Sequence, residues 1–196
     1  MDIQLVFGQK MFLSKCPDES FYTNETLRDS IEKVYRIPEV QDKVDTSQKG
    51  RALTSVGAGL NIATLPGIEQ LMQWIYGQIL EVATNLNLSG SQLVISRGWT
   101  NRMFKDCEGR CHTHPSHAHG IVIFYYQIPE NSAELILIDG GTNGSEYHDY
   151  PAVKKHHIVP SAGQLIIHHP SMPHAVSRHN NIEPRTCFIF EFELVN

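Results

Sequence analysis

The chain has 196 residues, of which 41% are hydrophobic and 19% are charged, and its formal net charge is −5. This composition is that of an ordinary globular protein and excludes a disordered or fibrous chain. The negative charge argues against a nucleic-acid surface, because phosphates are bound by clustered Lys and Arg. We expect a single domain over residues 1–196 that acts on a small molecule or a protein.

The first 13 residues contain no basic segment followed by a long apolar stretch, and no later run approaches the length of a membrane span. The four cysteines are scattered and do not resemble the disulfide framework of a small secreted domain. The sequence therefore predicts a cytoplasmic protein with reduced thiols and no membrane contact. It leaves the oligomeric state open, a homodimer included.

Periodic apolar residues predict a strand and a helix near the start of the chain. Ile3, Leu5 and Phe7 recur with a period of two, which indicates an entry strand. Asn24 is a suitable N-cap for a helix that ends before Pro38. The apolar side of this helix comprises Leu27, Ile31, Val34 and Tyr35.

A polar segment and a second helix follow. Residues 41–58 show no periodicity and predict a surface loop. Thr64, Pro66 and Glu69 open the clearest helix of the chain, which we expect to cover a sheet. Residues 1–91 thus form a predicted support region for the remainder of the chain. The apolar face of the second helix comprises Ile68, Leu71, Met72, Ile75, Tyr76, Ile79, Leu80 and Ala83.

Residues 92–196 change to short β-type runs separated by turn residues. Turn signals occur at Gly140–Gly144, Pro160–Gly163 and His179–Asn181. This spacing predicts an all-β core, a barrel or jelly roll, with the N-terminal helices flanking it. The expected strands are Leu93–Trp99, Ile121–Ile128, Glu134–Asp139, His156–Val159, Gln164–His168, His174–Ser177 and Thr186–Val195.

The distribution of histidine is the most informative feature of this second half. All eleven histidines lie between His112 and His179, and the first 111 residues contain none. His112 and His114 are two residues apart, so on an extended segment both point to the same side. His174 can approach them from a distant strand. Three imidazoles with open positions beside them suit a non-haem iron site, although imidazole also binds zinc, copper and nickel.

A single arginine begins the last expected strand. Arg185 lies eleven residues after His174. A guanidinium at the mouth of a barrel is well suited to hold a carboxylate by two hydrogen bonds. Along this strand Phe188, Phe190 and Phe192 alternate with Ile189, Glu191 and Glu193.

Two groups of residues together carry a family pattern. The first is Trp99-Thr100-Asn101, Gly109, His112-Thr113-His114-Pro115, Gly120, Tyr125-Tyr126 and Pro129. The second is Gly163-Gln164-Leu165-Ile166-Ile167, Pro170-Ser171, His174-Ala175-Val176 and Arg185. In order and spacing they resemble the 2-oxoglutarate/Fe(II)-dependent oxygenases of marine bacteria and their phages, in the prolyl-hydroxylase-like superfamily. The resemblance covers about Trp99 to Phe192, and residues 1–91 add nothing specific to it.

The resemblance implies a double-stranded β-helix, or jelly roll, that holds Fe(II). By position His112 would be the proximal ligand and His174 the distal one. His114 would stand where the wider superfamily has Asp or Glu, which makes the ligand set neutral. The resemblance also implies a bacterial cytosol, or that of a phage-infected host, as the location.

The resemblance further implies that 2-oxoglutarate is the cosubstrate, decarboxylated to succinate while a substrate is hydroxylated. Arg185 would bind its far carboxylate, with Tyr125 or Tyr126 as a hydroxyl partner. Cys187 stands where these enzymes often have a Ser or Thr that binds the same carboxylate, and a thiol is a weaker donor.

Other histidines have simpler interpretations. His117 and His119 repeat the spacing of the first pair and could be an alternative pair of ligands, but a turn at Pro115 favours loop positions near the entrance. His168 and His169 are neighbours on an expected strand, so one of them must face inward.

Cys107, Cys111 and His112 raise the alternative of a structural zinc site, because their spacing permits two thiolates and an imidazole around one ion. Against it, the chain offers no second thiolate pair. A zinc site would also leave His174 and Arg185 without a role.

Two further classes stay open. One is a cupin-like three-histidine metalloprotein, an isomerase or a dioxygenase without an oxoacid. The other is a non-catalytic binding module. The position of Arg185 relative to the metal pocket discriminates the cupin-like protein from an oxygenase. The substrate groove is expected from the loops 41–58 and 140–151, and the substrate itself is not indicated.

Overall fold

The computed structural model of the chain describes residues 1–41, 48–88, 92–115, 117–139 and 154–195. The predicted turn at 140–144 and the candidate substrate loop at 140–151 lie outside these residues. The strands are β1 Asp2–Val6, β2 Gln9–Lys15, β3 Gln48–Lys49, β4 Ala52–Thr54, β5 Gln92–Met103, β6 Glu108–His112, β7 Gly120–Gln127, β8 Leu135–Ile138, β9 Lys155–Ile158, β10 Gln164–His168, β11 His174–Val176 and β12 Arg185–Val195.

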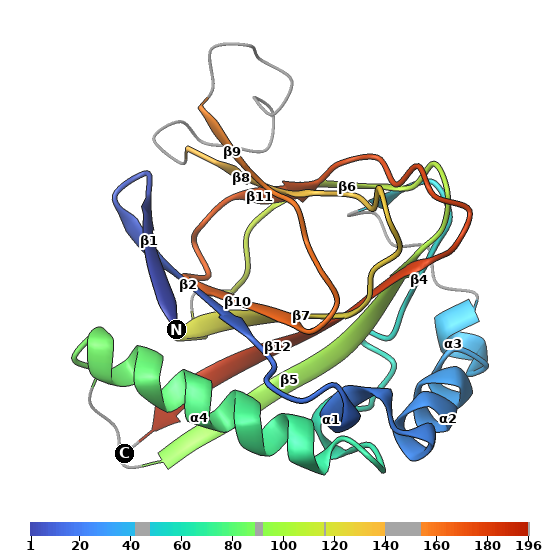
Figure 1. Cartoon of the computed structure of the whole chain (residues 1–196), viewed down its shortest axis with the longest axis horizontal. Helices are drawn as coiled ribbons and strands as arrows, with labels where there is room; N and C mark the ends of the chain where they lie inside the picture. The colour runs from blue at the N-terminus through green and yellow to red at the C-terminus, as the bar shows by residue number, and fades with distance from the viewer. Residues whose placement is uncertain (42–47, 89–91, 116, 140–153, 196) are drawn as a thin grey trace.

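These strands form two sheets that face each other (Figure 1). The seven-stranded sheet has the order β1-β2-β10-β7-β12-β5-β4, and the five-stranded sheet has the order β3-β6-β11-β8-β9. Neighbouring strands within each sheet are antiparallel. The predicted all-β core of the jelly-roll type is confirmed.

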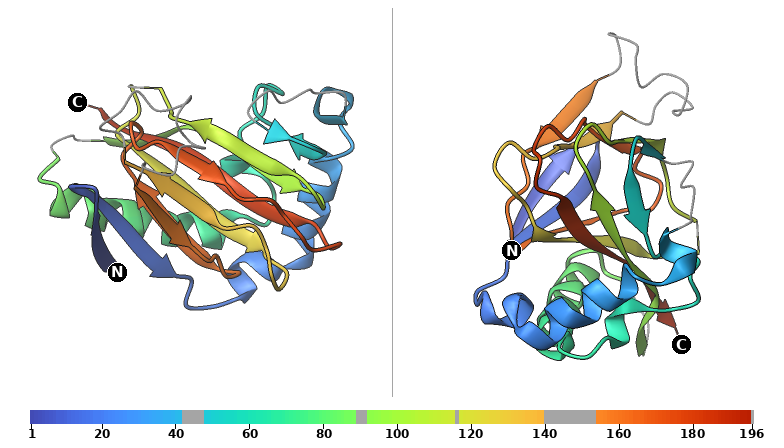
Figure 2. Two further views of the ribbon diagram at one scale, coloured as in Figure 1. Left: turned by 90° about the horizontal axis from the view of Figure 1, so that it is seen from above. Right: turned by 90° about the vertical axis from the view of Figure 1, so that its right-hand side faces the viewer.

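The helices lie on the outer face of the seven-stranded sheet, with α4 running across it (Figures 1 and 2). They are α1 Ser20–Thr23, α2 Glu25–Val34, α3 Pro38–Gln41 and α4 Glu69–Asn85, with a short 3-10 turn at Ile62–Thr64. Leu71, Ile75 and Ile79 of α4 are fully buried in one cluster with Phe188 and Phe190 of β12. Aromatic and aliphatic burial of this kind is the main favourable term in packing a helix on a sheet. The predicted flanking position of the helices is confirmed.

The predicted cap of the first long helix is also confirmed. The Asn24 side chain accepts a hydrogen bond from the Leu27 backbone N–H at 2.9 Å, and it donates to the Gly67 carbonyl oxygen at 2.8 Å. Gly67 has φ +87°, and a Cβ there would lie 2.5 Å from the Leu27 nitrogen. Only glycine fits this close approach. The cap therefore fixes the start of α2 against the segment that leads into α4.

The described part of residues 1–91 contributes four strands as well as helices, which exceeds the single strand expected. β2 has no simple alternation because both of its faces are covered. Met11 packs inside the barrel, whereas Phe12 packs under the helices. A strand buried on both faces reads as a continuous apolar run rather than as an alternating one.

Two sequence-based details are wrong. Within the segment predicted as a loop, β3 and β4 pair with β6 and β5, and strands of two or three residues are too short to show a period. On α4, Tyr76 and Leu80 are 37% and 55% exposed, so the buried stripe of this helix is narrower than its apolar face.

Among the described helices, none has the length and apolarity needed to cross a membrane.

Candidate metal centre and anion pocket

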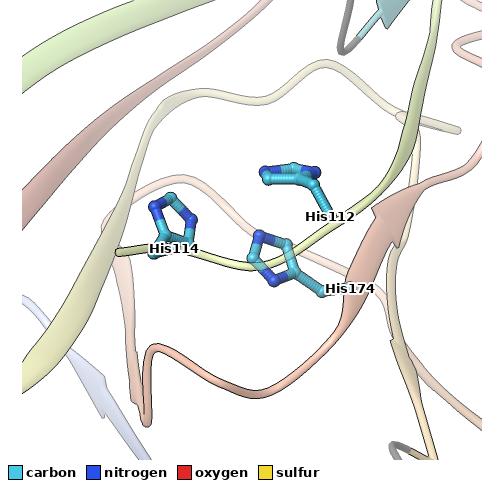
Figure 3. Close-up of side chains that lie close together, drawn as sticks. All are labelled: His112, His114 and His174. Atoms are coloured by element: carbon cyan, nitrogen blue, oxygen red, sulfur yellow. The ribbon is translucent and has the colours of Figure 1, made fainter. Parts of the chain in front are cut away.

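The structure brings the three candidate ligand histidines together (Figure 3). His112 ends β6 and His174 begins β11, and the two residues are direct partners in the antiparallel ladder. The next pair in this ladder is Val176 with Gly109, and the register shifts between the two pairs, so the strand pairing is irregular beside the site. His114 lies just beyond β6. The ligand-capable nitrogens of all three lie within 4.8 Å of one another, so one ion could be held between them.

The backbone fixes the tautomer of two of these rings. His112 Nδ1 lies 2.8 Å from the Arg110 carbonyl oxygen, and His174 Nδ1 lies 3.0 Å from that of Met172. Because a carbonyl can only accept, each Nδ1 carries the proton and each Nε2 keeps its lone pair. Burial, helped by the neighbouring histidines, holds the pKa of His174 well below its usual value. A neutral imidazole is the form that binds a metal.

The third ring has a different partner. His114 Nδ1 lies 3.3 Å from Glu191 Oε1, and their side chains are only 8% and 1% exposed. Glu191 Oε2 lies 3.4 Å from a guanidinium nitrogen of Arg97. Burial alone would raise the pKa of Glu191, but the His114 hydrogen bond and the Arg97 charge bring that pKa below its usual value. His114 therefore faces a carboxylate where the other two rings face carbonyls.

A fourth imidazole packs against the site from β10. The His168 ring is 4.9 Å from that of His174 in a T-shaped arrangement, and it is 2% exposed. Burial lowers the pKa of His168 to about 4. His169 is exposed, so of the two neighbours His168 is the one that faces inward, as one of them had to.

One cavity of about 210 Å³ is lined both by the three histidines and by Arg185. The Arg185 side chain enters this space from the start of β12 and is 2% exposed. Its guanidinium carbon lies 5.2 Å from the Tyr125 ring centre. The predicted arginine thus lies in the same pocket as the candidate metal ligands.

Arg185 is a buried cation whose hydrogen-bond partners are sulfur atoms, which are weak acceptors. One guanidinium nitrogen lies 3.5 Å from Met103 Sδ and 3.7 Å from Cys187 Sγ, and Nε has no hydrogen-bond partner. Within the described part of the chain no carboxylate forms an ion pair with it. An unpaired buried charge is costly, so this pocket is suited to receive an anion.

The two candidate tyrosines separate onto opposite faces of β7. Tyr125 lines the cavity and its buried hydroxyl has no hydrogen-bond partner among the described residues. Burial raises the pKa of this phenol, so it remains a donor at neutral pH. Tyr126 instead stacks on Phe188 at 4.8 Å, on the face toward the helices. Tyr126 therefore does not reach the anion pocket, because successive residues of a strand point to opposite faces.

Two polar residues of the cavity had no functional assignment in the sequence analysis, where Asn101 appeared only as part of the family pattern. Asn101 lies opposite Cys187 in the β5–β12 ladder, and its buried Oδ1 has no partner in the described structure. Glu191 was noted only as a member of the last strand. A signal was present, because Glu191 lies on the same alternating face as Arg185 and interrupts an otherwise apolar run.

The zinc alternative gains no support. Cys107 Sγ contacts Gln48 Oε1 at 3.3 Å, whereas Cys111 packs on the outer cluster around Ile136. Among the described residues, the three histidines lie close enough together to hold a metal ion, and no such group includes a cysteine. His117 and His119 are exposed and lie outside that group.

The fold and this pocket define a double-stranded β-helix with three imidazoles and a buried arginine in one cavity. No family model matches the sequence, and no curated protein matches it. Among solved structures, the chain is similar to a Pseudomonas putida prolyl-4-hydroxylase, with TM-score 0.60, 12% identity, and coverage of 95% of this chain and 93% of that one.

Two further solved structures extend the comparison. The viral collagen prolyl hydroxylase of Paramecium bursaria Chlorella virus-1, in complex with 2-oxoglutarate, gives TM-score 0.56 at 12% identity over 94% of this chain and 96% of that one. The α-ketoglutarate-dependent carbocyclase SnoK of nogalamycin biosynthesis gives 0.63 at 11% identity over 94% and 79%. The predicted resemblance to 2-oxoglutarate/Fe(II) oxygenases is confirmed at the level of the fold.

Proposed function

We propose that the protein is a 2-oxoglutarate- and Fe(II)-dependent dioxygenase. The observation that carries this proposal is that Arg185, a buried cation without a carboxylate partner among the described residues, lines the same cavity as the three clustered imidazoles. A cupin-like site needs the imidazoles and gives no reason for the arginine. The similar fold of known oxygenases, reported above, supports the same reading.

In this proposal His112, His114 and His174 hold the metal. Their clustered nitrogens and the neutral state of the buried His174 fit a divalent ion that imidazole binds well. Three protein ligands leave coordination positions open for other groups. The bound iron would supply the activation of oxygen and the oxidative decarboxylation of 2-oxoglutarate to succinate.

Arg185 and Tyr125 are the proposed partners of the cosubstrate. The guanidinium can donate two parallel hydrogen bonds to a carboxylate. The Tyr125 hydroxyl, which has no partner among the described residues, can donate a third. Cys187 adds a weak thiol donor on the same strand, in place of a hydroxyl. A dicarboxylate suits a pocket with a cation in one part and metal-binding nitrogens in another.

In this proposal the apolar walls of the cavity exclude water from the reacting groups. Trp99, Ile123, Leu135 and Ile189 surround the polar groups with apolar surface. Such walls keep bulk water out and strengthen the charge interactions inside. The chain would thus bind and orient the cosubstrate and shield the reaction, which oxidises a C–H bond of a small-molecule or protein substrate.

The test is an anaerobic titration of the protein with Fe(II) and then with 2-oxoglutarate, followed by visible absorption. We expect one ion per chain and a weak charge-transfer band on addition of 2-oxoglutarate. The matched control is 2-oxobutyrate, which has the same oxoacid end but lacks the carboxylate for Arg185, and it should bind far more weakly. Equal affinity for the two oxoacids, or no uptake of iron, would rule the proposal out.

A further inference from the structure

Glu191 is the single acidic side chain among the described residues that line the cavity. It is fully buried on β12, on the strand face that also carries Arg185. A buried carboxylate is held in place only when its charge is paired and its oxygens are hydrogen-bonded. The function proposed above gives Glu191 no task of its own.

The two oxygens of Glu191 have different partners. Oε2 lies 3.4 Å from Arg97, whose side chain is 45% exposed at the rim of the cavity. Oε1 lies 3.3 Å from His114 Nδ1 and points into the site. Arg97 thus holds one oxygen while the other is presented to the imidazole.

This contact determines how His114 can act. An ionised carboxylate only accepts hydrogen bonds, so His114 Nδ1 must carry the proton and Nε2 keeps the lone pair. A carboxylate behind a metal-binding imidazole orients the ring and makes it a more basic ligand. The carbonyl partners of His112 and His174 orient their rings without contributing a full charge.

The same contact bears on the residue type at position 114. The Cγ atoms of Asp and His occupy corresponding positions, so an aspartate there could place a carboxylate oxygen near the present Nδ1. That point is 3.3 Å from Glu191 Oε1. Two carboxylates so close resist being ionised together. With Glu191 in place, a neutral imidazole is the compatible residue.

We propose that Glu191 is a positioning residue of the metal centre, which holds His114 for coordination and supplies from behind the imidazole the negative charge that a carboxylate ligand would otherwise provide. This inference rests on the proposed function, because it requires His114 to bind the metal. A site with an aspartate ligand at position 114 and the present site would each have one carboxylate near this position. In the present site the carboxylate contacts the imidazole of His114 and not the ion.

The first test is Glu191→Gln, which keeps the shape of the side chain and removes its charge. Binding of Co(II) is measured by its visible absorption and by competition with a chelator. We expect a 10- to 100-fold weaker affinity, as is usual when the partner behind a ligating histidine is lost. Glu193→Gln, two residues further along the same strand and partly exposed, is the matched control and should bind as the wild type does.

A purely structural role for Glu191 would give another pattern. The metal-free Glu191→Gln variant would then unfold at a lower temperature while its affinity for Co(II) stayed that of the wild type. That result would overturn the inference and leave the proposed function standing. Failure of the wild-type protein to take up Co(II) or Fe(II) would instead remove the proposed function, and the inference with it.

The second test varies both residues. His114→Asp should bind Co(II) more weakly than the wild type, although aspartate is a good metal ligand, because two carboxylates would then be adjacent. The double variant His114→Asp/Glu191→Gln should bind more tightly than His114→Asp alone. The inference fails if His114→Asp binds as tightly as the wild type, a comparison that stands even if Glu191→Gln does not fold, or if the second substitution brings no gain.

Discussion

The two faces of β12 show how one strand serves both stability and chemistry. Toward the helices it presents Phe188, Phe190 and Phe192, all fully buried in a continuous apolar core. Toward the barrel interior it presents Arg185 and Glu191 at either end of the cavity-lining face. The first face is filled and the second is left partly hollow. Side chains two residues apart therefore belong to one environment, and neighbours belong to different ones.

The two faces of the seven-stranded sheet also differ energetically. On the face toward the helices, apolar side chains are in close contact, such as Phe124 of β7 and Tyr22 of α1 with ring centres 5.2 Å apart. The cavity face keeps buried polar atoms that have no partner in the described part of the chain, at Tyr125, Asn101 and Arg185. Each such atom costs about 1 to 3 kcal/mol if it stays unsatisfied. We infer that changes on the helix face should alter stability, whereas changes on the cavity face should alter binding.

The largest effect is expected from His174→Ala. Two imidazoles rarely hold a divalent ion, so metal uptake should be lost altogether. The metal content after incubation with Fe(II) or Co(II) and gel filtration checks this. His169→Ala, a change of an exposed neighbour, is the control and should retain the ion. Full metal content in His174→Ala would contradict the ligand assignment.

The helix face is tested by Phe190→Ala. Removing this fully buried ring leaves a cavity under α4 and should lower the free energy of unfolding by about 3 to 5 kcal/mol. Denaturant titration of the metal-free protein measures it. Leu5→Ala, at a site that is 74% exposed, should change stability by less than about 0.5 kcal/mol. Equal losses in the two variants would break the comparison between the faces.

The cavity face is tested by Arg185→Met, which replaces a buried cation by an apolar side chain of similar length. We expect 2-oxoglutarate binding to weaken by about 2 to 5 kcal/mol, because a desolvated charge pair is no longer formed. Metal content and metal-free stability should not fall, since the arginine has no carboxylate partner in the described structure. Calorimetry with Arg110→Met, an exposed arginine, as control measures the difference. An unchanged affinity would place the anion elsewhere.

The smallest effect concerns pH. Burial lowers the pKa of His168 from 6.5 to about 4, so between these values the unfolded chain binds a proton that the folded chain does not. The stability from neutral His168 is complete above about pH 6.5 and is lost as the pH falls toward 4. From pH 7 to pH 5 this amounts to about 1 to 2 kcal/mol. His168→Gln should flatten the pH dependence of metal-free unfolding, whereas His169→Gln should not.

Sequence periodicity predicted the parts of the fold whose faces differ. The helix after Asn24 has one buried and one exposed side, so its pattern could be read. The strands β10 and β12 are buried on both faces at most positions, and they were predicted from their β-type composition instead. β7 is buried on nearly all positions and reads as one apolar run, which is why the choice between Tyr125 and Tyr126 could not be made. Both faces of that strand look alike in the sequence.

The candidate site was predictable as a set of residue types but not as a set of contacts. The spacing of His112 and His114 and the family resemblance of His174 and Arg185 pointed to residues that now share one cavity. The contact of His114 with Glu191 spans 77 positions. This contact depends on how the two sheets pack against each other, and the local periodicity of the sequence contains no information about that packing.

The irregularity in the pairing of β6 with β11 ties metal binding to strand alignment. His174 is paired with His112, but two residues further along β11 the partner is Gly109, so β6 holds one residue more than its neighbour. An extra residue of this kind re-aims the side chains next to it. Deletion of this extra residue of β6 would turn the His112 side chain away from the barrel interior. Conversely, an ion bound by His112 and His174 would stabilise the observed pairing of β6 with β11. Because an ion that binds only the folded state raises the melting temperature, heat resistance gained on loading would report that the two strands are correctly matched.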